Sequence, residues 1–439
     1  MTPRTYFIET FGCQMNKGDS EFMAASLERE GFLPAPSEDE AGVVIFNTCS
    51  VRSHAEDRAL ARIREAKAHA GRGRVVAVAG CMAQRIGEEM IAQGAADLAM
   101  GPYRSLDAGK IISEFLIDRG RALHLTQERS LLASRVDTEC VTRDILPWHK
   151  WVTITHGCEN FCAYCIVPYV RGPLVSFESG EIIRSIERAA GNGVIEITLL
   201  GQNVNQYGQD SGDVPFHELL SRAAAVPGIA RVNFLTSHPK DFTPDIARVI
   251  AAHGNISRAI HLPLQSGSDR VLALMNRGYD MGHYLRVVDS IASVLPDYAL
   301  STDLIAGFPG ETADDFQGTL SAMERIRFDE AFMYAYSPRE GTAAFSLPES
   351  LTRAEKLERL RSIIDAQREI SRSRLAAREG RTERVIVESI SKKSADEVMG
   401  RTFLNHPMVL PGAKDDIGRV LDVVVRGLRG STLYGERVA

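Results

Sequence analysis

The chain has 439 residues, of which 44% are hydrophobic and 25% charged, an ordinary globular composition that disfavours disorder, collagen-like repeats and coiled coils. At roughly 150 residues per domain, this length predicts two to four domains. The sequence contains no run of about 20 apolar residues that could span a membrane. Its first residues, MTPRTYFIETFG, have no basic stretch ahead of an apolar one, so no signal peptide is expected. We therefore expect a soluble, cytoplasmic protein.

The formal net charge is −6 at pH 7, which argues against a protein that holds nucleic acid by electrostatics alone. The charge is unevenly distributed, because residues Arg353 to Ala439 contain 18 Lys and Arg against 13 Asp and Glu. This basic C-terminal part is compatible with a local RNA-binding surface, and a solvated helix face explains it equally well. The chain has seven cysteines, which in a reducing compartment indicate metal ligands or catalysts rather than disulfides.

The first part of the chain alternates short β-rich runs with helical patterns, which predicts a parallel sheet wrapped by helices. The expected strands are Tyr6–Thr10, Val43–Asn47, Val75–Ala79 and Asp97–Met100. The expected helices are Asp19–Glu30, Ser53–Ala70 and Arg85–Gln93. The polar stretch Leu125–Asp144 has little periodicity and is interpreted as a linker.

A second βα series begins at Trp151. Its expected strands are Trp151–Thr155, Ile195–Leu200, Arg231–Leu235, Ala259–Pro263, Ala299–Ile305 and Glu330–Tyr334, separated by helical patterns such as Glu178–Ala190, Asp241–Ala252 and Ala313–Arg327. Six βα units are too few for a closed eight-unit barrel, so a partial (β/α)6 barrel or an open sheet is expected.

The end of the chain changes pattern twice. A charged amphipathic helix is expected over Thr352–Glu379, and short β-rich runs separated by glycines follow it, which predicts a small β-barrel. The fold class is therefore α/β with an added β module. The expected domains cover residues 3–120, 144–375 and 376–439.

The central series opens with three cysteines in a C-x3-C-x2-C pattern, Cys158, Cys162 and Cys165, directly after its first strand. Three thiolates this close favour zinc or an iron–sulfur cluster, because soft ligands select these metals. A cluster of four irons held by three cysteines leaves one iron open to a substrate or cofactor. The alternative is a zinc site completed by His156, but structural zinc prefers paired C-x2-C units.

A second constellation lies in the first part of the chain. Cys13, Cys49 and Cys81 each follow an expected strand, and they are 36 and 32 residues apart, one βα unit each time. Because the carboxyl ends of parallel strands meet at one edge of a sheet, we expect these cysteines to converge on a metal. The alternative is three separate buried cysteines of the core. Cys140, in the expected linker, is interpreted as structural or free.

The C-x3-C-x2-C spacing after the first strand of a partial barrel resembles the radical SAM superfamily. The resemblance implies a [4Fe–4S] cluster whose open iron binds S-adenosylmethionine and cleaves it reductively to a radical. It also implies cofactor contacts at the carboxyl ends of the strands, from Tyr164, Gly201, Gln202, Asn203, Ser237, Gln265 and Gly307. Taken singly, each of these glycines and polar residues is explained by turn chemistry.

The whole chain closely resembles the methylthiotransferases, through Gly12-Cys13-Gln14-Met15-Asn16, Asn47-Thr48-Cys49, Gly80-Cys81-Met82-Ala83, Ile166-Val167-Pro168-Tyr169 and Asp303 to Thr312. The resemblance implies a second [4Fe–4S] cluster on Cys13, Cys49 and Cys81 that carries the sulfur to be transferred. It also implies that the C-terminal β module is a TRAM domain, which binds RNA. No catalytic side chain beyond the cluster ligands is expected.

The residues after Cys13 and Cys49 are similar to the MiaB type, which adds a methylthio group to N6-isopentenyladenosine at tRNA position 37. Members that act on a ribosomal-protein aspartate or on threonylcarbamoyl-adenosine remain alternatives, as does an RNA-binding protein with structural zinc. The expected partners are tRNA, an electron donor and a sulfur donor, and the expected state is a monomer. The family commonly has a Ser-Arg pair where Val175-Ser176-Phe177 stands, which leaves Arg171 as the nearest basic residue for a substrate contact.

Overall fold

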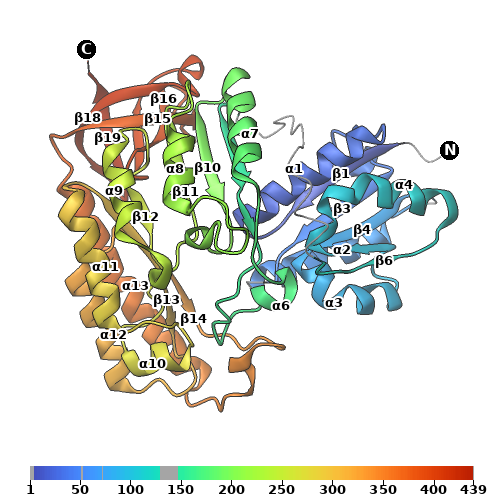
Figure 1. The fold of residues 1–439 in the computed structure, drawn as a ribbon, viewed down its shortest axis with the longest axis horizontal. Coiled ribbons are helices and arrows are strands. Elements are labelled where there is room, and N and C mark those ends of the chain that lie inside the picture. The colour runs from blue at the N-terminus through green and yellow to red at the C-terminus, as the bar shows by residue number, and fades with distance from the viewer. Residues whose placement is uncertain (1–3, 51–52, 72, 129–146, 439) are drawn as a thin grey trace.

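The computed structural model describes residues 4–50, 53–71, 73–128 and 147–438. An N-terminal sheet domain lies beside a central domain of strands and helices, and a small barrel formed by the C-terminal residues packs on the central domain (Figure 1). Among the described helices, none is both long enough and apolar enough to cross a membrane.

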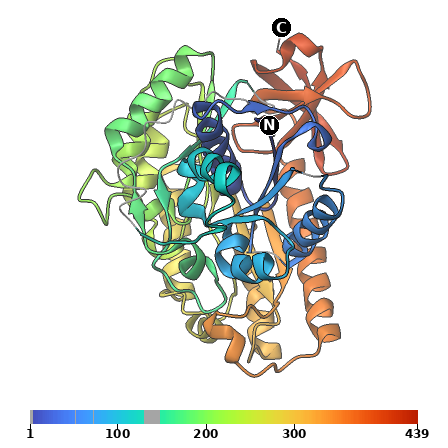
Figure 2. The ribbon, with the colours of Figure 1, turned by 90° about the vertical axis from the view of Figure 1, so that its right-hand side faces the viewer.

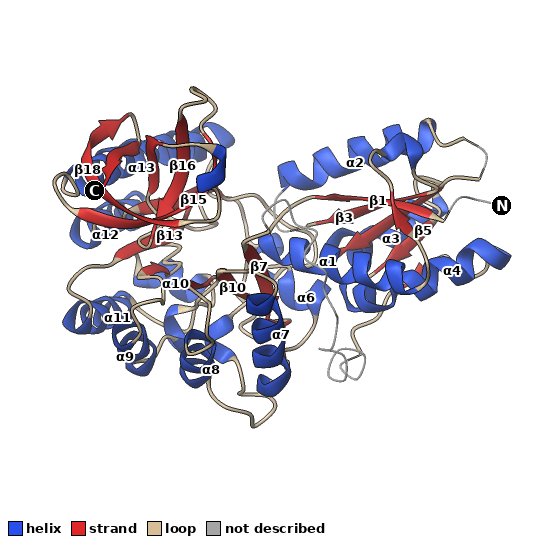
Figure 3. Ribbon diagram, turned by 90° about the horizontal axis from the view of Figure 1, so that it is seen from above, coloured by secondary structure: helices blue, strands red, loops and turns tan. Residues whose placement is uncertain are grey.

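The N-terminal domain is built on a six-stranded parallel sheet in the order β2-β1-β3-β4-β5-β6. β3 and β4 are buried along their whole length, as is typical of parallel strands covered on both faces. Helices α1 and α4 pack on one face and α2 and α3 on the other, so helices flank both sides of the sheet (Figure 3). The elements are β1 (Thr5–Thr10), α1 (Gln14–Arg29), β2 (Leu33–Pro34), β3 (Val43–Thr48), α2 (Ser53–Ala68), β4 (Val75–Gly80), α3 (Cys81–Ala92), β5 (Leu98–Met100), α4 (Ala108–Asp118) and β6 (Leu123–His124), with 3-10 turns at Glu38–Glu40 and Pro102–Asp107.

The central domain carries six parallel strands in two three-stranded sheets, β7-β10-β11 and β12-β13-β14, so the expected partial barrel is confirmed. Its strands are β7 (His149–Thr153), β10 (Glu196–Leu200), β11 (Arg231–Phe234), β12 (Ala259–His261), β13 (Ala299–Ala306) and β14 (Glu330–Ala335). Its helices are α6 (Val167–Arg171), α7 (Ser179–Gly191), α8 (Phe216–Ala224), α9 (Pro244–Ala252), α10 (Asp269–Leu274), α11 (Met281–Val294) and α12 (Ala313–Ile326). A two-stranded antiparallel pair, β8 (Thr155–His156) and β9 (Val175–Ser176), flanks the first crossover, and 3-10 turns lie at Val204–Gln206, Pro239–Asp241 and Ala343–Ser346.

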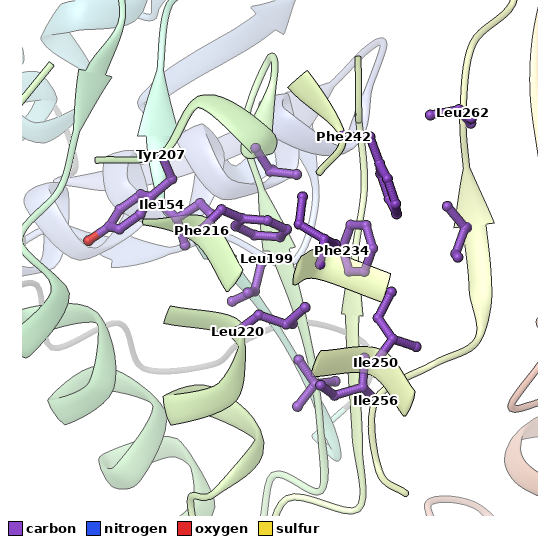
Figure 4. Close-up of a cluster of buried hydrophobic side chains, with 14 of the residues drawn as sticks. Ile154, Leu199, Tyr207, Phe216, Leu220, Phe234, Phe242, Ile250, Ile256 and Leu262 are labelled. Atoms are coloured by element: carbon purple, nitrogen blue, oxygen red, sulfur yellow. The ribbon is translucent and has the colours of Figure 1, made fainter. Parts of the chain in front are cut away.

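The core of the central domain fills the space between the first sheet and its covering helices. Phe216 of α8 and Phe234 of β11 meet edge to face with ring centroids 5.4 Å apart, and Leu199 and Ile250 pack around them (Figure 4). This apolar layer holds the strands in place, so the loops at their carboxyl ends are mounted on a rigid base.

The expected long helix and the expected small barrel are both present. α13 (Arg353–Ala376) packs against β13 and β14, and a closed five-stranded barrel with the order β15-β16-β17-β19-β18 follows. Its strands are β15 (Thr382–Ile390), β16 (Glu397–Thr402), β17 (Pro407–Pro411), β18 (Val420–Arg429) and β19 (Thr432–Arg437), with a 3-10 turn at Lys414–Asp416.

The barrel closes the end of the central domain at which the parallel strands begin. Arg231, the first residue of β11, donates a hydrogen bond to Thr402 O of the barrel (2.9 Å). His406 of the barrel lies 3.2 Å from Asp329, which directly precedes β14, and both side chains are buried. The carboxyl ends of the strands, where βα folds place their active sites, therefore lie at the end away from these contacts.

The structure differs from the sequence interpretation in several elements. α3 begins at Cys81 itself, four residues before the expected helix Arg85–Gln93, because Gly80 with φ +88° turns the chain directly out of β4. α4, β2, β6 and β19 were not expected. Most of the expected linker, with Cys140, lies outside the described residues.

Candidate active site

The first cysteine set lies in the loop between β8 and α6. Gly157 opens this loop with φ +79°, and an added Cβ would lie 1.9 Å from Pro173 O, so only glycine fits there. Farther along, the Cys165 N–H donates to Cys162 O (2.9 Å), which turns the chain so that the last two cysteines face the same region.

Burial governs the chemistry of these thiols. It raises the pKa of Cys158 to about 11. Burial, followed by the charges of Cys162 and Cys158, also raises the pKa of Cys165, which shows that the three thiols are neighbours. None of the six described cysteines is in a disulfide. Three unbridged thiols, two from buried residues and one from a partly buried residue, fit a soft metal centre, which would displace their protons on binding.

The loops after β10 and β11 carry buried polar atoms that have no hydrogen-bond partner among the described residues. They include both amide atoms of Gln202, Oδ1 of Asn203 and Oγ of Ser237. Buried polar groups in folded proteins are nearly always hydrogen-bonded, so such a group of atoms marks a place completed by a polar ligand. The amino, carboxylate and ribose groups of S-adenosylmethionine would satisfy these atoms, so the residues present fit this cofactor.

Asn160 joins these loops to the cysteine loop. Its Oδ1 accepts hydrogen bonds from Lys240 Nζ (2.8 Å) and Gln206 Nε2 (3.4 Å). Val204 N–H donates to Thr236 O (3.1 Å), which ties the loop after β10 to the loop after β11. The structure therefore brings Gln202, Asn203 and Ser237 to the side of the first cysteine set.

Tyr164 and Gly201 also lie in this region. The Tyr164 hydroxyl accepts a hydrogen bond from buried Arg277 (3.2 Å), and the same guanidinium nitrogen donates to Cys162 Sγ (3.2 Å). Gly201 lies directly against the Thr155 hydroxyl. Sequence reasoning missed Arg277, which lies outside the motifs, and Asn160, which occupies a variable position between Cys158 and Cys162.

Gln265 and Gly307 lie on the second three-stranded sheet. Gln265 has φ +73° and its N–H donates to Asp303 O (2.8 Å), which continues the pairing beyond β12. The Gly307 N–H donates to the Glu311 carboxylate (3.1 Å). Both residues sit at carboxyl ends of strands as expected, but the Gly307 N–H already has a partner within the protein.

The second cysteine set lies at one edge of the N-terminal sheet. Cys13 caps α1, Cys49 follows β3, and Cys81 is the first residue of α3 rather than a loop residue. A hydrogen bond with Cys49 lowers the pKa of Cys13 to about 6. Burial raises the pKa of Cys81, and the charge of Cys13 acts on it in the same direction. The three thiols are therefore neighbours.

Gly12 explains how Cys13 and Cys49 come so close. It has φ +105°, and an added Cβ would lie 2.2 Å from the Cβ of Cys49. The chain can pass over Cys49 at this distance only because residue 12 has no side chain.

The two cysteine sets meet across the contact between the N-terminal and central domains. Cys81 packs with Ile166 and Val170, and Ile166 directly follows Cys165 in the chain. α6 lies in this contact beside α3 (Figure 1), and the N-terminal domain covers this side of the central domain (Figure 2).

His156 does not take the place of a fourth ligand in the described arrangement. Its buried ring lies edge-on to Tyr103 of the N-terminal domain, with centroids 4.7 Å apart, and burial lowers its pKa well below the ordinary value. In the part of the chain that the structure describes, no three His, Cys, Asp or Glu side chains are placed to hold a metal ion. A cubane cluster reaches its thiolates through different irons, so its ligands stand farther apart than those around one ion.

Arg171 does not lie where the sequence interpretation placed it. It is 2% exposed, so its guanidinium is withdrawn from the surface instead of being offered to a substrate. It pairs with Asp19 of α1 (2.5 Å), a partner that sequence reasoning did not anticipate.

Comparisons with known proteins agree with this geometry. The chain is 42% identical to the tRNA-2-methylthio-N(6)-dimethylallyladenosine synthase of Moorella thermoacetica, over 99% of this chain and 98% of that protein. The synthase of the same name from Nitratidesulfovibrio vulgaris is 41% identical over 100% of this chain and 99% of that protein. The chain belongs to the tRNA-2-methylthio-N(6)-dimethylallyladenosine synthase family.

Three family models match this member of the synthase family. They are described as uncharacterized protein family UPF0004 (residues 5–101), radical SAM superfamily (residues 152–323) and TRAM domain (residues 376–438). The protein is therefore a radical SAM enzyme, with one cysteine set in each of the first two matched segments. The expected MiaB-type resemblance is confirmed.

Solved structures show the same fold at low sequence identity. The radical S-adenosylmethionine methyltransferase TsrM from Kitasatospora setae matches with a TM-score of 0.57 and 13% identity, over 78% of this chain and 77% of that one. The cobalamin-dependent S-adenosylmethionine radical enzyme OxsB matches with a TM-score of 0.51 and 11% identity, over 83% of this chain and 56% of that one.

Proposed function

We propose that this protein converts N6-isopentenyladenosine at tRNA position 37 to its 2-methylthio derivative. The observation that carries the proposal is the packing of Cys81, from one three-cysteine set, against Ile166, which adjoins Cys165 of the other. A centre that activates a carbon and a centre that supplies sulfur have to act on the same atom, and this contact brings both sets to one interface. The 42% identity over nearly the whole of the Moorella thermoacetica synthase supports the choice of substrate.

The proposed ligands of one [4Fe–4S] cluster are Cys158, Cys162 and Cys165, and those of the other are Cys13, Cys49 and Cys81. When bound, the two clusters and S-adenosylmethionine supply hydrogen abstraction at C2, the methyl group and the sulfur. The unpartnered atoms of Gln202, Asn203 and Ser237 would hold the polar groups of S-adenosylmethionine, with Tyr164, Gly201, Gln265 and Gly307 around it.

The protein's own side chains bind, orient and exclude water. Abstraction of a C2 hydrogen atom requires no general base, so we assign no catalytic side chain beyond the cluster ligands. The packing of Cys81 with Ile166 and Val170 closes the domain contact with apolar side chains, which keeps water away from the region where the two sets meet.

The C-terminal barrel is proposed as the tRNA-binding module. Lys392 and Lys393 are exposed in the loop between β15 and β16, where they could contact phosphates. We assign residues 3–120, 144–375 and 376–439 to the sulfur-carrying, radical and RNA-binding domains. We further propose that the chain acts in the cytoplasm as a monomer and receives electrons and sulfur from other donors.

Recognition of the prenyl group would favour the modified base. Unstacking a nucleotide costs a few kcal/mol. The isopentenyl group has five carbons, and each buried CH2 is worth about 0.8 kcal/mol, so its burial would offset that cost. Phe161, next to Cys162, and Tyr169 form an edge-to-face pair 5.9 Å apart, and each is about half exposed (50% and 46%). This pair offers apolar surface for the base beside the first cysteine set.

A competition experiment tests the proposal. An anticodon stem-loop with isopentenyladenosine and its unprenylated counterpart are mixed with the reconstituted enzyme, and methylthio nucleosides are measured by mass spectrometry. The prenylated RNA should react tens- to thousands-fold faster, since a difference of 1.4 kcal/mol is tenfold. Phe161→Ala should reduce this preference, whereas Ile117→Ala, which removes an 81% exposed side chain on α4, should not. Equal turnover of both RNAs would overturn the choice of substrate.

A further inference from the structure

Arg171 reaches from the central domain into the second cysteine set. It is the last residue of α6, yet its guanidinium is almost completely buried against α1 and α3 of the N-terminal domain. Its Nε donates a hydrogen bond to Cys81 Sγ at 3.2 Å. The second nitrogen, Nη2, donates to Asp19 (2.5 Å) and to Asn16 Oδ1 (3.3 Å).

The third nitrogen of this guanidinium is Nη1. Nη1 is buried and makes no hydrogen bond to any described residue. A buried N–H of a charged group is costly unless an acceptor completes it. The described residues supply no such acceptor for Nη1.

Asp19 holds the guanidinium in this position. Its side chain is 5% exposed and lies 2.5 Å from Arg171 Nη2. Since a buried charge without its partner is strongly destabilising, the pair fixes the Arg171 side chain across the domain contact. Asp19 also sets the local charge balance, because its carboxylate neutralises the guanidinium that faces Cys81.

The first cysteine set has a comparable arginine with different partners. Arg277 is also buried and donates to Cys162 Sγ (3.2 Å). Its other hydrogen bonds go to Tyr164 Oη (3.2 Å), Tyr279 Oη (3.1 Å) and Pro263 O (3.0 Å). Among the described residues, each set therefore has a buried arginine that donates to one of its cysteine sulfurs. Hydrogen bonds to cysteine sulfur and nearby net charge are two of the factors that set the potential of an iron–sulfur cluster.

We propose that Arg171 is a positioning residue of the second cysteine set, and that the Arg171–Asp19 pair sets the reduction potential of the cluster held there. The inference rests on the proposed function, which assigns a cluster to Cys13, Cys49 and Cys81. The guanidinium would stabilise the more negative, reduced cluster, and the Asp19 carboxylate would oppose it. The two residues therefore pull the potential in opposite directions.

The test is a redox titration of the full-length reconstituted enzyme, followed by electron paramagnetic resonance. Cys49→Ala first identifies the component of the paramagnetic resonance spectrum that belongs to the cluster of the second set, because that signal should be lost in this variant. Arg171→Gln should then lower its midpoint potential, by at least a tenfold change in the one-electron equilibrium, or 59 mV. Asp19→Asn should raise it. Arg277→Gln, the matched control, should leave this component unchanged and lower the other one.

Opposite shifts of the midpoint potential in Arg171→Gln and Asp19→Asn separate this role from a merely structural one. With a merely structural role, both substitutions would shift the potential in the same direction, or both variants would lose the cluster. If Arg171→Gln does not accumulate as folded protein, Arg171→Lys and Asp19→Asn decide the matter. The lysine variant keeps the charge but loses the Nε donor, so its potential should fall less than that of the glutamine variant. Unchanged midpoints in a protein with full iron content would overturn the inference. Iron bound by the first set alone in the unaltered enzyme would instead overturn the proposed function.

Discussion

Replacing Gly12 with alanine should remove one metal centre and spare the other. An L-residue at φ +105° is strained, at a cost of about 1–2 kcal/mol. The new Cβ would lie 2.2 Å from the Cβ of Cys49, which is about 1.2 Å closer than ordinary contact at 3.4 Å. Metal–ligand distances tolerate only about 0.2 Å. A displacement of Cys49 by the larger amount would therefore take its sulfur out of reach of the cluster.

Iron and sulfide content after anaerobic reconstitution measures the effect. The unaltered enzyme should hold about eight irons, four for each cubane, and Gly12→Ala about four. The variant should still cleave S-adenosylmethionine but form no methylthio product. Gly193→Ala is the matched control, because Gly193 has φ +90° and an added Cβ there meets nothing within 4 Å. It should keep both clusters. Full iron content and wild-type methylthiolation in Gly12→Ala would refute the reasoning.

Three other perturbations test separate parts of the molecule. Cys49→Ala should still form 5′-deoxyadenosine without a methylthio product, whereas Cys162→Ala should lose both, as chromatography of the reaction mixture would show. Alanine at Lys392 and Lys393 should weaken tRNA binding and reduce the slope of log K against log salt by about 2, and an unchanged slope would place the phosphate contacts elsewhere. Burial opposes ionisation of Asp329, but hydrogen bonds from the barrel and α13 outweigh it and lower its pKa below 3.8. The ionised Asp329 therefore stabilises the folded state above pH 3.8, and this contribution is lost as the pH falls through the lowered pKa. The free energy of unfolding of Asp329→Asn should lack this part of the acid dependence, as unfolding curves at several pH values would show.

The parts of the fold that could be predicted are those with a local signal. Val43–Phe46 and Val75–Ala79 are continuous apolar runs, and the expected strands Val43–Asn47 and Val75–Ala79 form β3 and β4 almost as expected. The spacing of Cys13, Cys49 and Cys81 predicted their convergence because every parallel strand delivers its carboxyl end to the same edge. β2 and β6 could not be found this way, since each has only two residues and therefore no periodicity to detect.

The parts that could not be predicted depend on residues far apart in the sequence. Arg171 and its partner Asp19 are 152 positions apart, and Arg277 lies 115 positions from Cys162. The sequence offers Arg171 only as the nearest basic residue to the missing Ser-Arg pair, and nothing local indicates that its side chain is buried in an ion pair. Only the folded structure shows that both arginines face sulfur, Arg171 across the contact between two domains and Arg277 within the central domain.

The position of the barrel implies a minimum size for the RNA. The barrel covers the end of the central domain where the strands begin, and both cysteine sets lie toward the opposite end. β13 has eight residues, and at about 3.3 Å per residue it spans about 26 Å. An RNA that is held by the barrel and modified at the cysteine sets has to bridge at least this length. A free nucleoside is too short to occupy both places, whereas a folded stem-loop reaches from one to the other.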